Sequence, residues 1–247
     1  MKKQILSCAV LLFITLGTAV AQRTVNVDSF DKVIVSPHIE VTFVQGTNES
    51  VTIENSKVDD AKLNIEVKGK TLRVYLEGAK DIPKNEKVYV DGHKMKRSLY
   101  KGTQVTATIT YTQVDEFSLR GDEQFLFQDK IDQEELRLKI YGESKVTFEE
   151  LQLQKLHTTI YGESYLKINA GNVVNNKIVA FGESEVNMLD MENNNTKLTA
   201  YGEGEFSLNT SDQIRITAYG EAVIGYTGTP DIKKGLTLGE VKIHEIN

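Results

Sequence analysis

The sequence predicts an all-β protein: a parallel β-helix (β-solenoid) with rungs of about 20 residues, preceded by an irregular β-rich N-terminal layer. Glycines recur at nearly constant spacing through the second half of the chain, and apolar residues alternate with other residues around each of them, which is the period of a strand. The competing architecture is an antiparallel meander. It would require Asn-Gly or Asp-Gly turns between strands, and the repeats contain none.

The repeat is marked by glycines separated by steps of 21, 20, 20, 20, 18 and 19 residues: Gly121, Gly142, Gly162, Gly182, Gly202, Gly220 and Gly239. Residues two and four before each glycine, and four and six after it, are mostly apolar, as Ile140 and Val146 are around Gly142. The residue two after the glycine is usually Ser, Gly or Ala, so the side chains that point inward become small once in each repeat. We expect each glycine to lie at a structural corner, where a side chain would collide with the core.

Parallel stacking of these units would bury a continuous core, with neighbouring strands about 4.8 Å apart. The second corner is expected in stretches rich in turn residues, such as NAGNVVNN and LDMENNN. Around Gly239 the apolar residues Leu236, Leu238, Val241 and Ile243 shift parity. Residues 116–247 are therefore expected to form the β-helix with a C-terminal cap.

Residues 1–21 have the features of a secretory signal peptide. Two lysines precede an apolar run from Ile5 to Val20, and Ala19 and Ala21 form an A-x-A cleavage site. The run is too short for a confident membrane span and nothing later exceeds it, so we do not expect a membrane-spanning protein. The mature chain is expected to be exported.

Composition limits the function classes. Cleavage after residue 21 removes Cys8, the only cysteine, so the exported chain must be held together by its core and not by disulfides. The net charge of -6 argues against a nucleic-acid partner, because no basic surplus exists to displace counterions from phosphates. The one basic run, His93–Arg97, is expected to be a solvated loop.

Residues 22–115 are expected to form the irregular layer, packed on the solenoid, because no Pro-rich or Ser/Gly-rich linker follows them. Turn residues at 46–50 (GTNES) and 68–70 (KGK) are expected to connect hairpins. The strand-like segments that they help to separate are residues 33–35, 39–44, 51–53, 63–67, 71–76 and 105–111.

The order of these features resembles one family. FDKVIV at Phe30–Val35, VTFVQG at Val41–Gly46, GKTLRV at Gly69–Val74, the strand–glycine repeats and YTGTP at Tyr226–Pro230 are similar to the head GIN domain family, a domain of unknown function described as a "putative auto-transporter adhesin". The resemblance implies an exported β-rich protein of the Gram-negative envelope, in the periplasm, on the outer-membrane surface or secreted, and it implies no catalytic residues. This chain departs from the family in one respect: six of its seven repeats have Glu at the first position after the glycine, three of them as Gly-Glu-Ser, where the family has a small residue.

Two outward columns are the candidate binding features. If the apolar positions point inward, the residue before each repeat glycine points outward and forms an aromatic ladder: Tyr141, Tyr161, Phe181, Tyr201 and Tyr219. Stacked aromatics stabilise neighbouring strands, so the ladder has a purely structural explanation. The alternative is an adhesive surface for a glycan, a partner protein or another copy of the chain.

The residue after each glycine forms an acidic column: Glu143, Glu163, Glu183, Glu203, Glu221 and Glu240, extended by Asp122. Like charges on neighbouring strands are destabilising, and no matching lysine column compensates them. Solvation at an exposed corner would suffice, and so would bound Ca²⁺, for which the first five glutamates are the candidate ligands.

The sequence favours a non-enzymatic adhesin or envelope assembly protein without a cofactor, Ca²⁺ excepted. The repeat contains no acid/base constellation that breaks its pattern, and the four histidines lack a metal-ligand spacing. Two alternatives are kept: a polysaccharide-active β-helix enzyme, either lyase or hydrolase, and a cation-stabilised structural scaffold.

Overall fold

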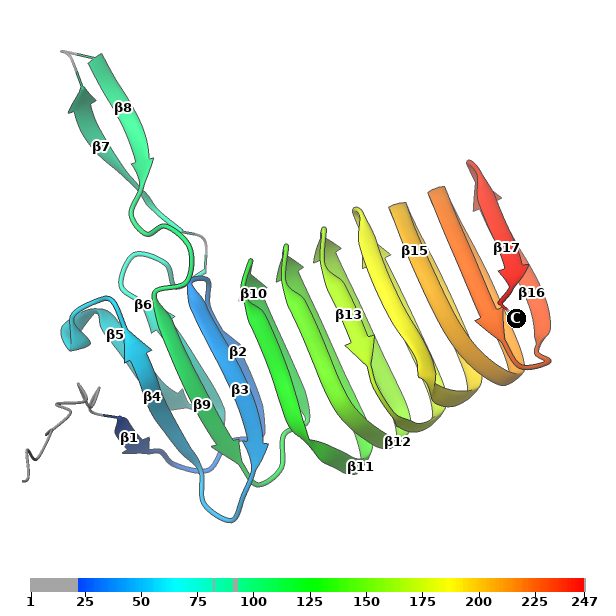
Figure 1. Cartoon of the computed structure of the whole chain (residues 1–247), viewed down its shortest axis with the longest axis horizontal. Coiled ribbons are helices and arrows are strands. Elements are labelled where there is room, and N and C mark those ends of the chain that lie inside the picture. Colours follow the sequence, from blue (N-terminus) through cyan, green and yellow to red (C-terminus); the bar gives the residue numbers. More distant parts are fainter. Residues whose placement is uncertain (1–21, 82, 91–92, 247) are drawn as a thin grey trace, which may run out of the picture.

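The computed structural model describes residues 22–81, 83–90 and 93–246. About 75% of the protein is strand, and a β-solenoid of about six turns, with rungs about 20 residues apart, fills its C-terminal part (Figure 1). The predicted fold class is confirmed. The predicted signal peptide, residues 1–21, lies outside the described residues. Within the described ranges, no helix has the length and apolar character needed to cross a membrane.

The solenoid strands pair in parallel, each with the strand about one repeat further along the chain. The registers bring equivalent residues together: Gly121 pairs with Gly142, and Gly142 with Gly162. The strands are β10 (Glu116–Gly121), β11 (Gln124–Gly142), β12 (Lys145–Gly162), β13 (Tyr165–Ile168), β14 (Gly171–Phe181), β15 (Ser184–Thr227), β16 (Asp231–Leu238) and β17 (Val241–Glu245).

The N-terminal strands continue the same stack. β2 pairs in parallel with β10, and β3 with the start of β11, so Ser36–His38 between them is the corner of an additional rung. β6 and β9 extend the two sides, and β5, β4 and β1 complete them by antiparallel pairing. These strands are β1 (Arg23–Asn26), β2 (Lys32–Val35), β3 (Ile39–Gln45), β4 (Ser50–Ser56), β5 (Leu63–Lys68), β6 (Thr71–Leu76) and β9 (Val105–Tyr111), with a 3-10 turn η1 (Asp60–Lys62) before β5.

One of the two expected hairpins is confirmed and the other is wrong. β5 and β6 are joined by Gly69 and Lys70 alone, with φ of 54° and 57°, the left-handed conformation that a two-residue hairpin turn needs. Residues 46–50 do not close a hairpin, because β9 lies between β3 and β4 and pairs with both. A strand 50 residues later in the chain supplies that pairing, so local turn residues could not indicate it.

The basic run at His93–Arg97 is part of a strand, and the expectation of a solvated loop is wrong. β7 (Asn85–Val90) and β8 (His93–Ser98) form a separate antiparallel hairpin that extends away from the body (Figure 1). The run HKMKRS lacks a regular alternation of apolar and polar residues. Backbone pairing with β7 therefore holds this run as a strand, although its sequence lacks the alternation that predicts one.

A single core runs through the N-terminal strands and the solenoid, from Phe30 to Ile224. At their junction three buried rings stack across consecutive rungs: the centroids of Phe43 and Phe127 are 4.4 Å apart, and those of Phe127 and Phe148 are 3.9 Å apart. These contacts bury large apolar surfaces from both parts, so the junction is packed like the interior of either.

The repeat glycines lie at corners, but the obstacle that requires them differs from the predicted one. Gly162 has φ of 115°, and a Cβ there would come closer than 3.0 Å to the carbonyl oxygen of Gly142, one rung earlier. The side chain would thus meet the backbone of the preceding rung and not the core. The other members share φ values between 103° and 130°: Gly121, Gly142, Gly182, Gly202, Gly220 and Gly239.

The small residue two after the glycine has a specific role. The Ser164 hydroxyl, almost fully buried, donates a hydrogen bond of 2.9 Å to the carbonyl oxygen of Gly142, which also accepts the backbone N–H of Glu163 at 3.0 Å. Ser144 makes the same bond one rung earlier, to Gly121 at 2.7 Å. The corner is therefore held by a serine and a glycine acting across neighbouring rungs.

At the C-terminal end, β16 and β17 add another parallel turn. The parity shift seen in the sequence corresponds to a register irregularity opposite Ile216 and Ala218. Ile243 still packs partly against the core, whereas Leu236 and Leu238 are each 58% exposed. The last turn thus leaves two large apolar side chains in solvent.

Candidate functional site

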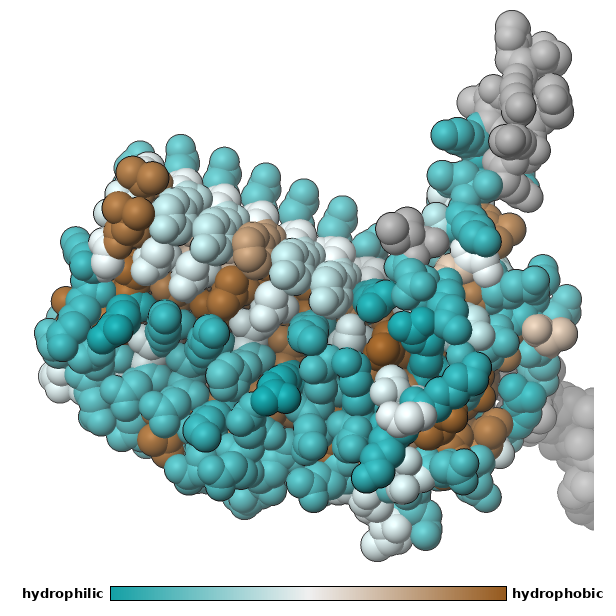
Figure 2. All heavy atoms as spheres, turned by 180° about the vertical axis from the view of Figure 1, so that it is seen from behind, coloured by the Kyte–Doolittle hydropathy of each residue, from teal (hydrophilic) through white to brown (hydrophobic). Residues whose placement is uncertain are grey.

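The five residues of the aromatic ladder lie side by side on one face of the solenoid. Their rings stack in an unbroken row, with centroids 4.7 to 5.1 Å apart and interplanar angles of 2° to 6°. Figure 2 shows this row crossing the face, with evenly spaced hydrophilic side chains along the edge above it. The strand registers produce the row, because Tyr141, Tyr161, Phe181 and Tyr201 are direct partners.

The stacking decides which part of each ring a ligand can reach. Each inner ring has both faces covered by its neighbours, so only ring edges and the tyrosine hydroxyls point outward. Tyr161 and Tyr201 remain 41% and 39% exposed, while Tyr141, Phe181 and Tyr219 are half-buried. The ladder therefore offers a flat, narrow strip of edges and hydroxyls, and not a platform on which a single sugar ring could stack.

Both ends of the ladder are continued by other side chains. At the N-terminal end the guanidinium of Arg120 lies over the ring of Tyr141, 5.4 Å from its centroid, a cation–π contact. At the C-terminal end Leu238 is the strand partner of Tyr219. The strip is thus bounded by a charge at one end and by an exposed apolar side chain at the other.

The acidic column lies in solvent, because each of its glutamates is exposed. Glu240 has a basic partner, Lys242 at 2.9 Å, and this hydrogen bond lowers the pKa of Glu240. Across the described ranges there is no group of three or more His, Cys, Asp or Glu side chains placed to hold a metal ion. Exposure to water is enough to accommodate the repeated like charges, and Ca²⁺ binding by the column remains the alternative to it.

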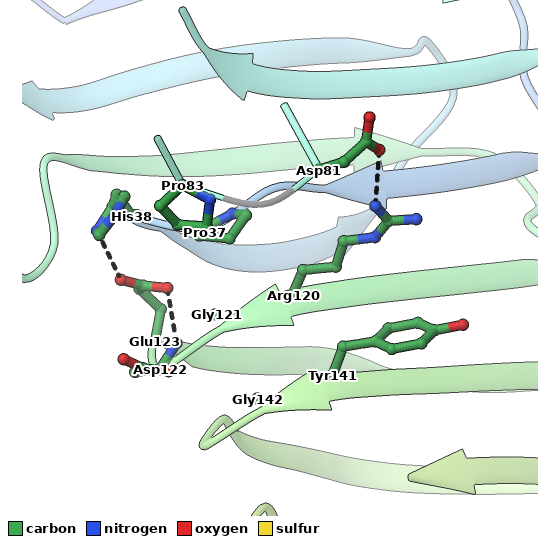
Figure 3. A pocket seen from close by; sticks show the side chains of 10 residues that line it. All are labelled: Pro37, His38, Asp81, Pro83, Arg120, Gly121, Asp122, Glu123, Tyr141 and Gly142. Carbon is green, nitrogen blue, oxygen red and sulfur yellow. Dashed lines mark hydrogen bonds and ion pairs between the residues drawn. The ribbon is translucent and has the colours of Figure 1, made fainter. Parts of the chain in front are cut away.

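A pocket of about 520 Å³ opens at the N-terminal end of the ladder, where the repeat is broken (Figure 3). The rung that contains Gly121 has Arg120 in place of the aromatic residue, Asp122 in place of the glutamate and Glu123 in place of the serine. In the preceding rung Pro37 lies against the glycine corner, where a Cβ on Gly121 would meet it, and Ser36 follows Val35, the strand partner of Leu119. Ser36 is fully buried and donates a hydrogen bond of 2.6 Å to the carbonyl oxygen of Lys80, so the segment after β6 covers the position where the ladder would continue.

The pocket holds buried polar groups. Burial raises the pKa of the Glu123 carboxyl, which is 4% exposed and lies 3.9 Å from Nδ1 of His38. Arg120 donates from Nη1 to Asp81 at 2.8 Å, while its Nε and Nε2 of His38 are buried without a hydrogen-bond partner. Figure 3 shows the Glu123–His38 pair and the Arg120–Asp81 pair in separate parts of the lining.

Sequence reasoning did not predict this pocket. One part of the pocket has a signal in the sequence, because RGDE at 120–123 departs from the repeated YGES. Other lining residues come from the corner at Pro37 and His38 and from the segment after β6, and the repeat does not point to them. The registers that bring them to Gly121 involve strands more than 80 residues apart.

The solved structures confirm how widely the architecture is shared. A structure described as that of a putative adhesin from Bacteroides fragilis is 19% identical, with a TM-score of 0.76, over 93% of this chain and 98% of that one. One from Parabacteroides merdae, also described as a putative adhesin, is 16% identical with a TM-score of 0.65, over 92% and 96%. A third, described as a putative lipid binding protein from Parabacteroides distasonis, is 16% identical with a TM-score of 0.63, over 92% and 96%.

At these identities the likeness is one of fold. Comparison with the curated proteins gives no match. The family comparison is more direct, because one family matches residues 29–230, which is most of the chain. The chain belongs to the family described as "putative auto-transporter adhesin, head GIN domain".

Proposed function

We propose that the protein is an exported, non-enzymatic adhesin or assembly protein of the cell envelope that binds its partner through the aromatic ladder and the acidic column beside it. The observation that carries the proposal is the unbroken stack of five rings on a rigid solenoid, with exposed edges at Tyr161 and Tyr201. The family and the descriptions of its structural neighbours support an adhesive role.

The geometry favours an extended partner over a small one. A strip of ring edges and hydroxyls offers many weak contacts in a line, and such contacts add up only against a partner surface or chain of similar length. The exposed glutamates along the strip would accept hydrogen bonds from hydroxyl or amide donors of that partner. A protein surface, a glycan chain or the ladder of a second copy each meets these requirements.

The test is the triple variant Tyr161→Ser, Phe181→Ser, Tyr201→Ser of the mature chain. We expect it to lose binding on glycan and protein arrays, or to lose self-association in analytical ultracentrifugation, while circular dichroism shows an intact fold. The stacked pairs contribute about 0.2 to 1 kcal/mol each, so the variant should melt at a somewhat lower temperature and remain folded.

A matched control changes the adjacent outward column on the same rungs, with Thr159→Ala, Val179→Ala and Thr199→Ala. This variant should bind as the unmodified chain does. Binding that survives in the serine variant, or that is lost equally in both variants, would contradict the role of the ladder.

A second candidate function, a polysaccharide lyase or hydrolase, is favoured by the pocket at the N-terminal end of the aromatic ladder. Glu123 is a buried carboxyl whose pKa is raised, as a general acid requires, and Arg120 and Asp122 lie nearby. Incubation with acidic and neutral glycans, followed by assays for new reducing or unsaturated ends, tests this activity. Product formed by the unmodified chain and not by Glu123→Gln would establish the enzyme, and no product across the panel would exclude it for those glycans.

A further inference from the structure

A third outward column, made of basic residues, runs along the solenoid parallel to the aromatic ladder. It consists of the residue five before the glycine in the five rungs from Gly142 to Gly220: Arg137, His157, Lys177, Lys197 and Arg215. The registers bring these side chains into line, because Arg137 pairs with His157, His157 with Lys177 and Lys177 with Lys197. The signal of this column in the sequence is the fixed distance to the glycine, which was not among the predicted site features.

The basic column borders a groove. A depression of about 300 Å³ is lined by His157, Lys177, Lys197 and Arg215 together with a neighbouring column of Lys155 and polar side chains that carry amides. The amide column consists of Asn175, Asn195 and Gln213. We call this site the basic groove; it combines cationic donors with amides that can both donate and accept hydrogen bonds.

The charges in the middle of the groove are not neutralised by the protein. At one end of the column Arg137 pairs with Glu135 at 2.6 Å, and beyond the other end Lys233, the strand partner of Arg215, pairs with Asp231 at 3.4 Å. Among the residues that the structure describes, Lys177 and Lys197 have no acidic partner, and Arg215 contacts only the Gln213 amide oxygen at 3.5 Å.

This arrangement has no explanation in folding. Like charges on paired strands repel each other, and the protein as a whole is acidic, with a net charge of -6, so acidic partners were available to it. Lysines alone could be solvated side chains, but their alignment along a groove with amides between them is what a linear anion would require. The rungs repeat every 4.8 Å or so, which spaces the cations regularly along the stack.

We propose that the basic groove binds an extended anionic polysaccharide. Its carboxylate or sulfate groups would pair with Lys177, Lys197 and Arg215, and its hydroxyls would bond to the amide column. A single-stranded nucleic acid fits less well, because the neighbouring aromatic rings cover one another's faces and leave none on which a base could stack. The proposal goes beyond the adhesin proposal and does not depend on the ladder binding anything.

The experiment measures binding of the mature chain to polygalacturonate, dextran sulfate, neutral dextran and single-stranded DNA by isothermal titration calorimetry at several NaCl concentrations. The variant is Lys177→Gln, Lys197→Gln, Arg215→Gln. The control is Lys62→Gln, Lys84→Gln, Lys101→Gln, which removes the same charge from exposed lysines of the N-terminal layer. We expect a salt-dependent affinity for one of the two anionic polysaccharides that falls about tenfold in the groove variant, as three exposed charge pairs imply, and is kept in the control.

A second readout separates this role from a structural one. Because the variant removes repulsion between neighbouring rungs, its melting temperature at low salt should equal or exceed that of the unmodified chain. If the triple variant fails to fold, the single variants Lys177→Gln and Lys197→Gln are measured instead. The proposal is overturned if neither anionic polysaccharide binds, if neutral dextran or DNA binds equally well, or if groove and control variants lose affinity alike.

Discussion

Replacement of a single corner glycine tests the physical basis of the whole repeat. In Gly162→Ala the new Cβ would meet the carbonyl oxygen of Gly142, and the residue would have to hold a φ of 115°. Gly142 cannot move aside freely, because its carbonyl accepts hydrogen bonds from both Ser164 and Glu163. The substitution therefore forces two rungs apart.

The expected loss of stability can be worked out from these contacts. Backbone strain at a sparsely populated φ costs about 1 to 3 kcal/mol, and weakening of the two hydrogen bonds costs about 1 kcal/mol each. The lower entropy of the unfolded alanine chain offsets roughly 0.4 to 1 kcal/mol. The net loss is about 3 kcal/mol, which for a chain of this size lowers the melting temperature by about 6 to 12 °C.

Gly69→Ala is the matched control. Gly69 also has a positive φ, of 54°, but a Cβ there would meet nothing within 4 Å. It should cost only the left-handed strain, about 1 to 2 kcal/mol, less the same entropic offset. Thermal and urea melts of both variants make the comparison, and a Gly162 variant as stable as the Gly69 variant would refute the proposed collision between rungs.

Three further predictions concern the corner and its charges. Ser164→Ala should destabilise the protein by about 1 kcal/mol in urea melts, because the buried hydroxyl bond to Gly142 is lost, and an unchanged midpoint would show that the bond contributes nothing. Burial raises the pKa of the Glu123 carboxyl above that of the unfolded chain, so the folded state binds this proton more tightly. The contribution to stability is present below the unfolded pKa and is lost as the pH rises through the folded pKa. Glu123→Gln should remove this loss of stability at higher pH. Melting temperatures measured from about pH 4, close to the ordinary carboxyl pKa, to about pH 8 would show the difference. A pH profile identical to that of the unmodified chain would contradict the prediction. Millimolar Ca²⁺ or a chelator should leave the melting temperature unchanged, because the corner glutamates are exposed and solvated, whereas a Ca²⁺-dependent rise would favour the cation-stabilised scaffold.

The sequence by itself determined the stack. The period of two within each rung and the period of about 20 between rungs are local properties, and a parallel solenoid places equal positions of successive rungs side by side. The aromatic row therefore followed from the spacing of Tyr161, Phe181 and Tyr201 alone. The basic column follows from the sequence in the same way, because its residues stand at a fixed distance of five before the glycine.

Only the tertiary structure decided the features that depend on contacts between distant segments. The strand β9 between β3 and β4, the corner at Pro37 that ends the ladder, and the pocket around Glu123 each join residues that no repeat relates. The glycine is the clearest case. The sequence placed Gly162 at a corner, but the atom that excludes a side chain there, the carbonyl oxygen of Gly142, belongs to the neighbouring rung, and its position is fixed only when the rungs stack.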